Sequence, residues 1–137
     1  MRAPHPVARA ALAWVFVFSG QDVLRHPPKA AATAGPLLGT LRRAVPVALP
    51  PDETVVRANA AVQVLGGIAL AAGIAPRQMA AALAGSLVPT TLAGHAFWTH
   101  EDPAQRVNQR NHFNKNLGLF GGLLAVALAG GKGSHES

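Results

Sequence analysis

Long apolar segments constrain the fold of this chain more than any other feature. Four stretches of 17 to 20 residues consist largely of Ala, Leu, Val and Gly. About 20 apolar residues cross the hydrocarbon core of a membrane as a helix, which satisfies its backbone polar groups internally. The sequence therefore predicts an all-α integral membrane four-helix bundle, with helices at residues 7–24, 58–75, 79–98 and 113–129.

The composition supports a membrane setting. Half of the 137 residues are hydrophobic and 13% are charged, against roughly a quarter charged in an average soluble domain. A soluble domain needs a charged surface, whereas helices that face lipid need none. We expect a single transmembrane domain over residues 1–137, and the alternative fold is a soluble Ala-rich bundle.

Residue usage excludes several classes of function. Cysteine is absent, so the chain itself forms no disulfide, thiolate metal site or cysteine nucleophile. The net charge is +6, but the basic residues are scattered, and we do not expect nucleic acid binding. The six histidines form no HxxH or HExxH pair, so no metal site is predicted.

The first apolar segment has some features of a secretory signal peptide. Arg2 and Arg9 precede the apolar run at residues 10–20. No small-x-small cleavage site follows, because polar residues begin directly at Gln21. We therefore expect this segment to be retained as the first helix.

The three connections differ in character. Residues 26–57 contain six of the eleven prolines, so we expect a loop there with at most a short interfacial helix at residues 37–47. Residues 73–76 form a tight turn that makes the neighbouring helices antiparallel. The third connection, residues 99–112, is strongly polar.

The order of several signals is repeated in the two halves of the chain. Each half has a glycine six residues before a histidine, and an asparagine seven residues before a glycine pair. In the first half these are Gly20 before His26, and Asn59 before the glycines at 66–67. In the second half they are Gly94 before His100, and Asn114 before the glycines at 121–122. This pattern predicts two tandem helical hairpins related by an axis along the membrane normal; coincidence in a Gly- and Ala-rich sequence is the alternative.

Small residues recur at helical spacing on two of the predicted helices. Gly118 and Gly122 form a GxxxG pattern, and Gly66 and Gly73 lie on one face of the second helix with Ala69. Such faces let helix backbones approach closely in lipid. We expect them to serve packing within the bundle rather than a dedicated dimer interface.

Polar side chains converge on one end of the predicted bundle. Because the helices alternate in direction, the ends of the first and third and the starts of the second and fourth share one side. Polar residues inside a membrane are candidates for function by default. The candidate polar pocket consists of Gln21, Asp22, His26, Arg57, Asn59, Gln63, His95, Trp98, His100, Lys115 and Asn116.

Each of these residues also has a purely structural explanation. Asp22 could pair with Arg25 or Arg57, and Asn59 could bridge two helices. His95 and Trp98 could belong to an interfacial belt. No catalytic residue is predicted, and whether the protein is an enzyme is left open.

Three segments together resemble the DoxX family of small four-helix membrane proteins. These are FSGQDVL at residues 18–24, LGGIALAAG at 65–73 and AGHAFWTHEDPAQRVNQRNHFNKNLGLFGGLL at 93–124. The last segment is the most specific, the Pro-rich first loop fits least well, and the resemblance covers nearly the whole chain. It implies a link to redox metabolism, since relatives include a subunit of thiosulfate:quinone oxidoreductase and proteins associated with superoxide dismutase and a sulfurtransferase.

The resemblance and the polar end lead to a functional hypothesis. We expect a membrane anchor or accessory subunit of a quinone-linked or oxidative-stress redox complex in the bacterial cytoplasmic membrane. Its partners would be the lipid bilayer and other subunits of that complex. The chain itself would hold no cofactor, although a quinone or lipid could occupy the pocket. The alternatives are a small-molecule transporter or carrier and a purely structural subunit.

Basic residues predict an orientation. Eight Lys and Arg residues lie on the side of the first and third loops, against four on the side of the termini. The positive-inside rule then places the loops in the cytoplasm and both termini outside.

Overall fold

The computed structural model describes residues 5–129, and helices dominate that range. The elements are α1 (Pro6–Arg25), α2 (Pro27–Ala44), α3 (Asp52–Ala72), α4 (Pro76–Gly94), the short 3-10 helix η1 (Phe97–Thr99) and α5 (Pro103–Leu128). No described residue lies in a strand. The predicted all-α class is confirmed, although the described residues form five α-helices rather than four.

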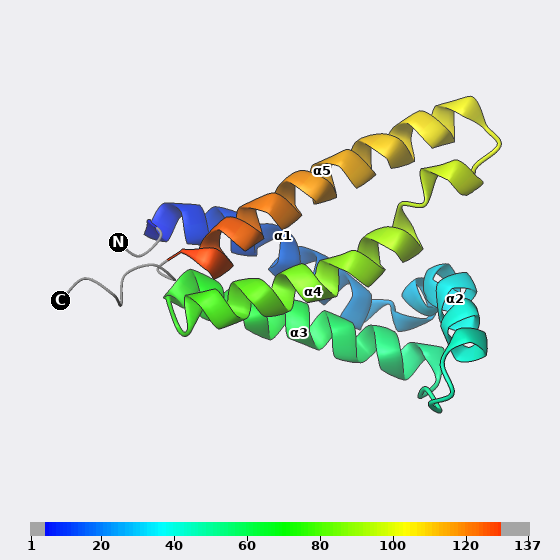
Figure 1. Cartoon of the computed structure of the whole chain (residues 1–137), viewed down its shortest axis with the longest axis horizontal. Coiled ribbons are helices and arrows are strands. Elements are labelled where there is room, and N and C mark those ends of the chain that lie inside the picture. Colours follow the sequence, from blue (N-terminus) through cyan, green and yellow to red (C-terminus); the bar gives the residue numbers. More distant parts are fainter. Residues whose placement is uncertain (1–4, 130–137) are drawn as a thin grey trace.

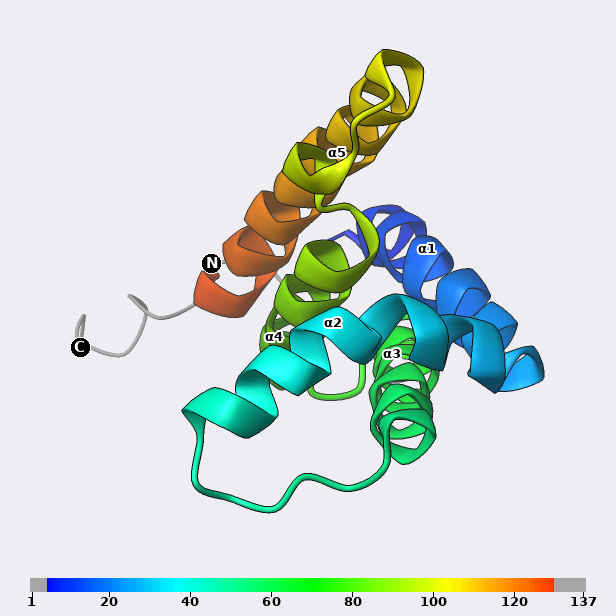
Figure 2. The same ribbon diagram turned by 90° about the vertical axis from the view of Figure 1, so that its right-hand side faces the viewer.

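Four of the helices run in alternating directions and the fifth crosses one end of them. Figure 1 shows α1, α3, α4 and α5 side by side, with the α3–α4 turn and both ends of the described chain at the same end. The helix α2 lies across the opposite end, against α3 and α4 (Figure 2). The helix α3 packs against both α1 and α4, whereas α5 packs mainly against α4. The rotational relation between the two halves stays a prediction.

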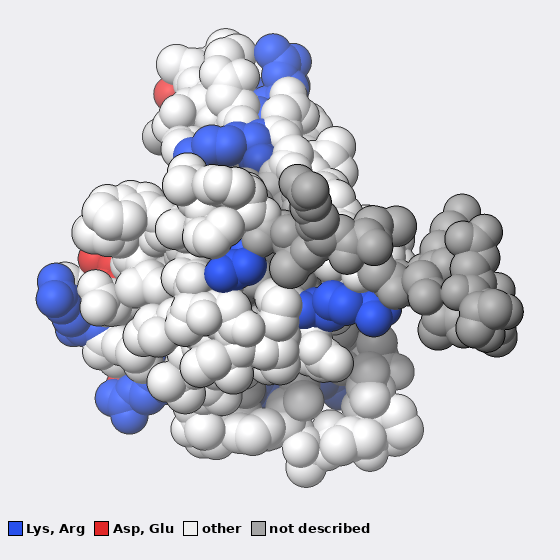
Figure 3. Space-filling model, turned by 90° about the vertical axis from the view of Figure 1, so that its left-hand side faces the viewer, with Lys and Arg blue, Asp and Glu red and all other residues white. Residues whose placement is uncertain are grey.

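The interior is small and apolar, and much of the outer surface is apolar too. Phe16, Leu70, Leu83 and Leu123 are the largest fully buried side chains. Trp14 is nevertheless 65% exposed on α1, and many other large apolar side chains also face outward. Figure 3 shows one end of the molecule, where uncharged surface separates the scattered Lys and Arg side chains. An apolar exterior on this scale suits contact with lipid better than contact with water.

Two helices, α1 and α3, are long and apolar enough to cross a membrane by length and composition. The sequence predicted four such helices. The helix α4 begins with Pro76, Arg77 and Gln78, and the first turns of α5 are polar, so neither helix is apolar over its full length.

The Pro-rich segment corrects the predicted loop at residues 26–57. Residues Pro27–Ala44 form a continuous helix, α2. Pro27 and Pro28 occupy its first positions, where a backbone N–H group would have no acceptor within the helix. Pro36 lies inside the helix and removes a single hydrogen bond, which the surrounding Ala-rich turns tolerate.

The other boundaries also differ from those predicted. The second helix starts at Asp52 rather than residue 58, because Pro51 precedes it and two acidic residues favour its first turn. The last helix starts at Pro103 rather than residue 113, and the Asp102 carboxylate caps it by accepting from the Ala104 N–H at 3.2 Å. The third helix ends at Gly94 rather than residue 98. The polar third connection is therefore mostly helical.

Candidate functional site

A polar network joins α3 to α4. Gln63 Nε2 donates to Ser86 Oγ and to Thr90 Oγ1, both at 3.1 Å. Asn59 Nδ2 donates to Thr90 Oγ1 at 2.9 Å, and the Ser86 hydroxyl donates to Asn59 Oδ1 at 2.6 Å. Gln63 is only 3% exposed and Ser86 only 7%. These hydrogen bonds therefore form largely out of contact with solvent.

The hydrogen-bond pattern fixes how the two amides are turned. The Thr90 hydroxyl donates to the main-chain carbonyl of Ser86 at 2.9 Å, and a carbonyl can only accept. The Thr90 oxygen must therefore accept from Asn59 and Gln63, which places both amide nitrogens towards it. The Gln63 Oε1 atom is left without a hydrogen-bond partner among residues 5–129, and it is not sealed in by protein atoms.

A cavity of about 580 Å³ opens beside this network, between α1, α3 and α4 and beneath α2. Its size suits a small organic ligand, since such sites typically measure roughly 300–1,000 Å³. Its polar lining residues are Ser19, Asp22, His26, Lys29, Thr33, Asn59, Gln63, Thr90, His95 and Gln109. Its larger apolar lining residues are Val23, Leu37, Leu38, Val55 and Val56.

The helix α2 forms the roof of the cavity and is fastened at both ends. His26 ends α1 and precedes α2, so a single residue joins the two helices. At the far end, Arg42 of α2 forms an ion pair with Asp52 at the start of α3 and donates to the Pro50 carbonyl at 2.6 Å. The roof is therefore tied to both α1 and α3.

His95 brings α5 into the wall of the cavity. Its Nδ1 atom lies 2.7 Å from Gln109 Oε1, and both residues line the cavity. The His95 ring also stacks on His112, with ring centroids 5.0 Å apart. Burial, helped by the nearby Lys115 and His95, lowers the pKa of the His112 imidazole below its ordinary value. The His112 imidazole therefore favours its neutral form at neutral pH.

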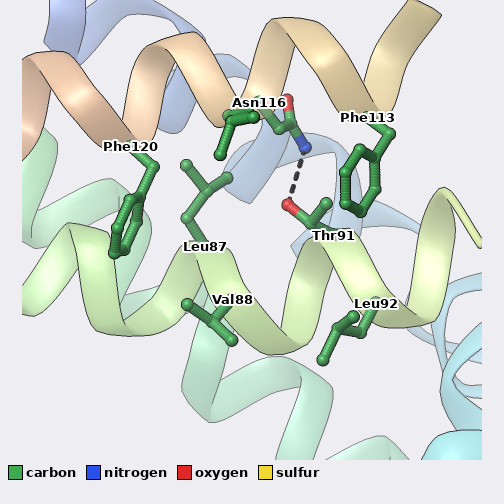
Figure 4. A pocket seen from close by; sticks show the side chains of 8 residues that line it. Leu87, Val88, Thr91, Leu92, Phe113, Asn116 and Phe120 are labelled. Atoms are coloured by element: carbon green, nitrogen blue, oxygen red, sulfur yellow. Dashed lines mark hydrogen bonds between the residues drawn. The ribbon is translucent and has the colours of Figure 1, made fainter. Parts of the chain in front are cut away.

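A second, shallower cavity of about 190 Å³ lies between α4 and α5. Figure 4 shows Phe113 and Phe120 of α5 at the two ends of this cavity. A single hydrogen bond crosses the cavity in the space between these two rings. In that bond Asn116 Nδ2 donates to Thr91 Oγ1 at 3.0 Å. Apart from this pair its lining is apolar, so it offers a ligand little beyond shape and apolar contact.

An aromatic cluster lies where α5 passes η1. The ring centroids of Phe97 and Trp98 are 5.2 Å apart, and those of Phe97 and Phe113 are 5.4 Å apart. Trp98 is 52% exposed. This arrangement fits the interfacial belt that was the structural explanation for Trp98.

Comparison with known proteins identifies the family. The model of the DoxX family matches residues 6–96. The chain belongs to the DoxX family. No curated protein and no solved structure matches the chain. DoxX proteins are membrane-associated, in agreement with the two helices of this one that are long and apolar enough to cross a membrane.

The family match covers less of the chain than the resemblance suggested. It ends at residue 96, so most of the segment at 93–124, the most specific part of the resemblance, lies outside it. The match includes the whole Pro-rich segment, the part of the chain in which the resemblance is weakest. In this DoxX protein the matched part, α1 to α4, supplies all the lining of the large cavity except Gln109.

The structure brings five of the eleven predicted site residues together around the large cavity of this DoxX protein. They are Asp22, His26, Asn59, Gln63 and His95. Asp22 and His26 face each other across one turn at 3.7 Å, and both are exposed. Because the Asp22 side chain is 80% exposed, it offers a charge to a ligand without the cost of burying it.

The other six lie elsewhere. Asn116 is in the cavity between α4 and α5, and Arg57 pairs with Glu53 at 2.8 Å on the surface. Trp98 belongs to the aromatic cluster, because α4 ends at Gly94, before it. The remaining three, Gln21, His100 and Lys115, do not line either cavity.

Sequence reasoning missed the partners of the two amides. Ser86 and Thr90 are four residues apart on α4, as Asn59 and Gln63 are on α3, and this matched spacing was the available signal. Gln109 was missed because its segment was expected to be a loop. Among the described residues there is no group of three or more His, Asp or Glu side chains that could hold a metal ion.

Proposed function

We propose that this DoxX protein is a membrane subunit of a redox complex and that the cavity beneath α2 holds a quinone-type ligand. The observation that carries the proposal is the cavity of about 580 Å³ with hydrogen-bonding amides on one wall and aliphatic side chains on another. A quinone headgroup is a ring with apolar faces and polar substituents, so it needs both kinds of wall.

The residue content supports an accessory role rather than a complete enzyme. The chain has no cysteine, so it carries out no thiol chemistry itself. Electrons for a bound quinone would come from a partner subunit. The resemblance to a subunit of thiosulfate:quinone oxidoreductase supports a partner of that kind.

We further propose that the protein resides in the bacterial cytoplasmic membrane with the cavity towards the cytoplasm. The basis is the excess of Lys and Arg on the side that carries α2. A redox partner would then reach the cavity from the cytoplasm. Alkaline phosphatase fused after Ser137 should be active. If that fusion is inactive, and green fluorescent protein fused at the same place fluoresces, the proposed orientation is overturned.

A binding experiment tests the ligand. The protein in lipid nanodiscs is titrated with menadione and with its reduced form, menadiol, and binding to empty nanodiscs is subtracted. Because the chain lacks cysteine, menadione forms no thiol adduct with it. We expect saturable binding of at least one form, and binding of neither would overturn the proposal.

A matched pair of variants locates the binding. Ala34→Trp fills the cavity from its roof, because Ala34 lines it from α2. Ala32→Trp adds the same side chain on the exposed side of α2, away from the lining. We expect the first variant to weaken binding about tenfold or more, from a loss of roughly 1.4 kcal/mol, and the second to leave it unchanged.

Co-purification tests the complex. A tagged protein extracted in mild detergent should bring down redox proteins at several expression levels. Recovery of the chain alone, together with ligand uptake into proteoliposomes that contain only this protein, would instead support the transporter alternative.

A further inference from the structure

We infer that the cavity beneath α2 selects a ligand that presents an aromatic hydroxyl, so that it binds the reduced, quinol form in preference to the quinone. This inference rests on the proposed function, because it assigns the redox form of the ligand proposed there. It comes from the hydrogen-bonding groups that the α3–α4 network leaves unused.

The first unused group is an acceptor. Gln63 is only 3% exposed, and it lines the cavity. Both hydrogens of its Nε2 atom are engaged, one by Ser86 and one by Thr90. Its Oε1 atom has no partner among the described residues. Because this oxygen is not sealed in by protein atoms, a ligand that donates to it gains a hydrogen bond.

The second unused group is a donor next to that acceptor. Asn59 Nδ2 carries two hydrogens, and one of them goes to Thr90. Asn59 and Gln63 lie one helical turn apart, and both donate to the same Thr90 oxygen, at 2.9 Å and 3.1 Å. An unused donor and an unused acceptor therefore lie close together on one wall of the cavity.

A hydroxyl group fits this pair, since it donates one hydrogen bond and accepts another. A quinone carbonyl or a methyl ether can only accept, so either would leave Gln63 Oε1 unpaired. A carboxylic acid is ionised near pH 7 and has no proton to donate, whereas a phenol titrates near pH 10 and keeps its proton. An ammonium group donates but would bring a charge to a side chain that is nearly fully buried.

The network also keeps the acceptor in place. To exchange the positions of its oxygen and nitrogen, Gln63 would have to give up both bonds to Ser86 and Thr90. The Thr90 proton is held by the Ser86 carbonyl, so Thr90 has none to offer in exchange. The preference for a donor is therefore built into the α3–α4 contact rather than set by a mobile side chain.

Three probes that differ only in these groups test the inference on the unaltered protein in nanodiscs. They are menadiol kept reduced under anaerobic conditions, its dimethyl ether, and menadione. We expect menadiol to bind about fivefold to tenfold more tightly than the other two after correction for partitioning into empty nanodiscs, as one net hydrogen bond provides. Equal binding of all three, or tighter binding of menadione, overturns the inference but leaves the proposed function standing. Binding of none overturns both.

A variant places the preference at the amide. Gln63→Met keeps the length of the side chain but removes the acceptor, and we expect it to bind menadiol and the dimethyl ether equally. A preference that persists in a folded Gln63→Met protein would overturn the assignment to Gln63. If this variant does not fold, the Ala34→Trp and Ala32→Trp pair decides instead. In that case menadiol preference must be lost only in the variant that fills the cavity, and a preference kept in both overturns the assignment.

Discussion

The contact between α1 and α3 and the contact between α4 and α5 use glycine in opposite ways. A Cβ atom on Gly20 of α1 would lie 2.8 Å from the Ala60 carbonyl oxygen and 2.6 Å from Val64 Cγ2 of α3. On α3, a Cβ atom on Gly67 would lie 2.8 Å from Val17 Cγ2 of α1. The two helices therefore approach so closely that each needs glycine opposite the other.

The helices α4 and α5 also contain glycines, but their contact with each other does not need them. A Cβ atom added to Gly85, Gly118 or Gly121 would meet nothing within 4 Å. Side-chain pairs hold these helices instead, such as Asn116 with Thr91, and a cavity remains between them. The comparison shows that a glycine pattern marks a close contact only where the glycine faces another backbone, and that α5 is the more weakly attached helix.

The largest expected effect follows from the close contact. Gly20→Ala forces a methyl group against the backbone of α3, and we expect it to lower the free energy of unfolding by about 2–3 kcal/mol. The measurement is unfolding by sodium dodecyl sulfate in mixed micelles, followed by the helical circular dichroism signal. The matched control is Gly118→Ala, which should be neutral or stabilise by up to about 1 kcal/mol, because alanine is the better helix former. Equal destabilisation by both substitutions would contradict the comparison.

The next effect concerns the polar network between α3 and α4. Gln63→Leu removes two hydrogen bonds and leaves the Ser86 and Thr90 oxygens with fewer donors. We expect a loss of about 1–2 kcal/mol in the same unfolding measurement. Val62→Leu, a substitution one residue away at an exposed position that retains the network, serves as the control for altered side-chain volume. A Gln63→Leu protein as stable as the parent would show that the network does not hold the helices together.

A smaller effect is expected between α4 and α5. Asn116→Leu removes the hydrogen bond to Thr91, and a hydrogen bond between membrane helices contributes about 0.6 kcal/mol on average. Thr91→Val removes the same bond from the other side. If the two residues act only through that bond, the double variant should be no less stable than either single variant, and strictly additive losses would refute this.

The smallest expected effect is a dependence of stability on pH that comes from His112 of α5, which stacks on His95. Burial lowers the pKa of His112 in the folded protein, so the unfolded chain takes up a proton first as the pH falls. The contribution of His112 to stability is therefore present above about pH 6.5 and is lost as the pH falls below it. Thermal unfolding between pH 7.5 and pH 5 should show the midpoint falling. His112→Gln should reduce that fall, and an identical fall in both proteins would exclude His112 as its source.

Parts of the fold could be predicted because they depend on local patterns. The first helix was placed to within a residue at each end, since its apolar run has clear limits. The tight turn between α3 and α4 was also predicted, and Gly73 ends α3 with a positive φ of 78°. The helix α2 was missed because prolines usually break helices, and two of them instead occupy the start of one.

The candidate site was predictable in outline only. Alternation of helix direction placed Asp22, Asn59 and His95 at one end of the molecule, and all three line the cavity. The sequence could not show that α2 covers this end, because that depends on long-range packing. Ser86 and Thr90 were overlooked because hydroxyl side chains are common on membrane helices, and only a neighbouring amide makes them part of a network.

The α3–α4 network has a consequence for how the chain enters the membrane during synthesis. The amides of α3 find their partners on α4, and only residues 73–75 separate the two helices. If α3 entered the lipid before α4, Asn59 and Gln63 would face hydrocarbon without their hydrogen-bond partners. Such exposure makes insertion of a helix less favourable. Release of α3 and α4 together, as one preformed hairpin, avoids that exposure. We therefore expect α3 to leave for the lipid only after the ribosome has completed α4.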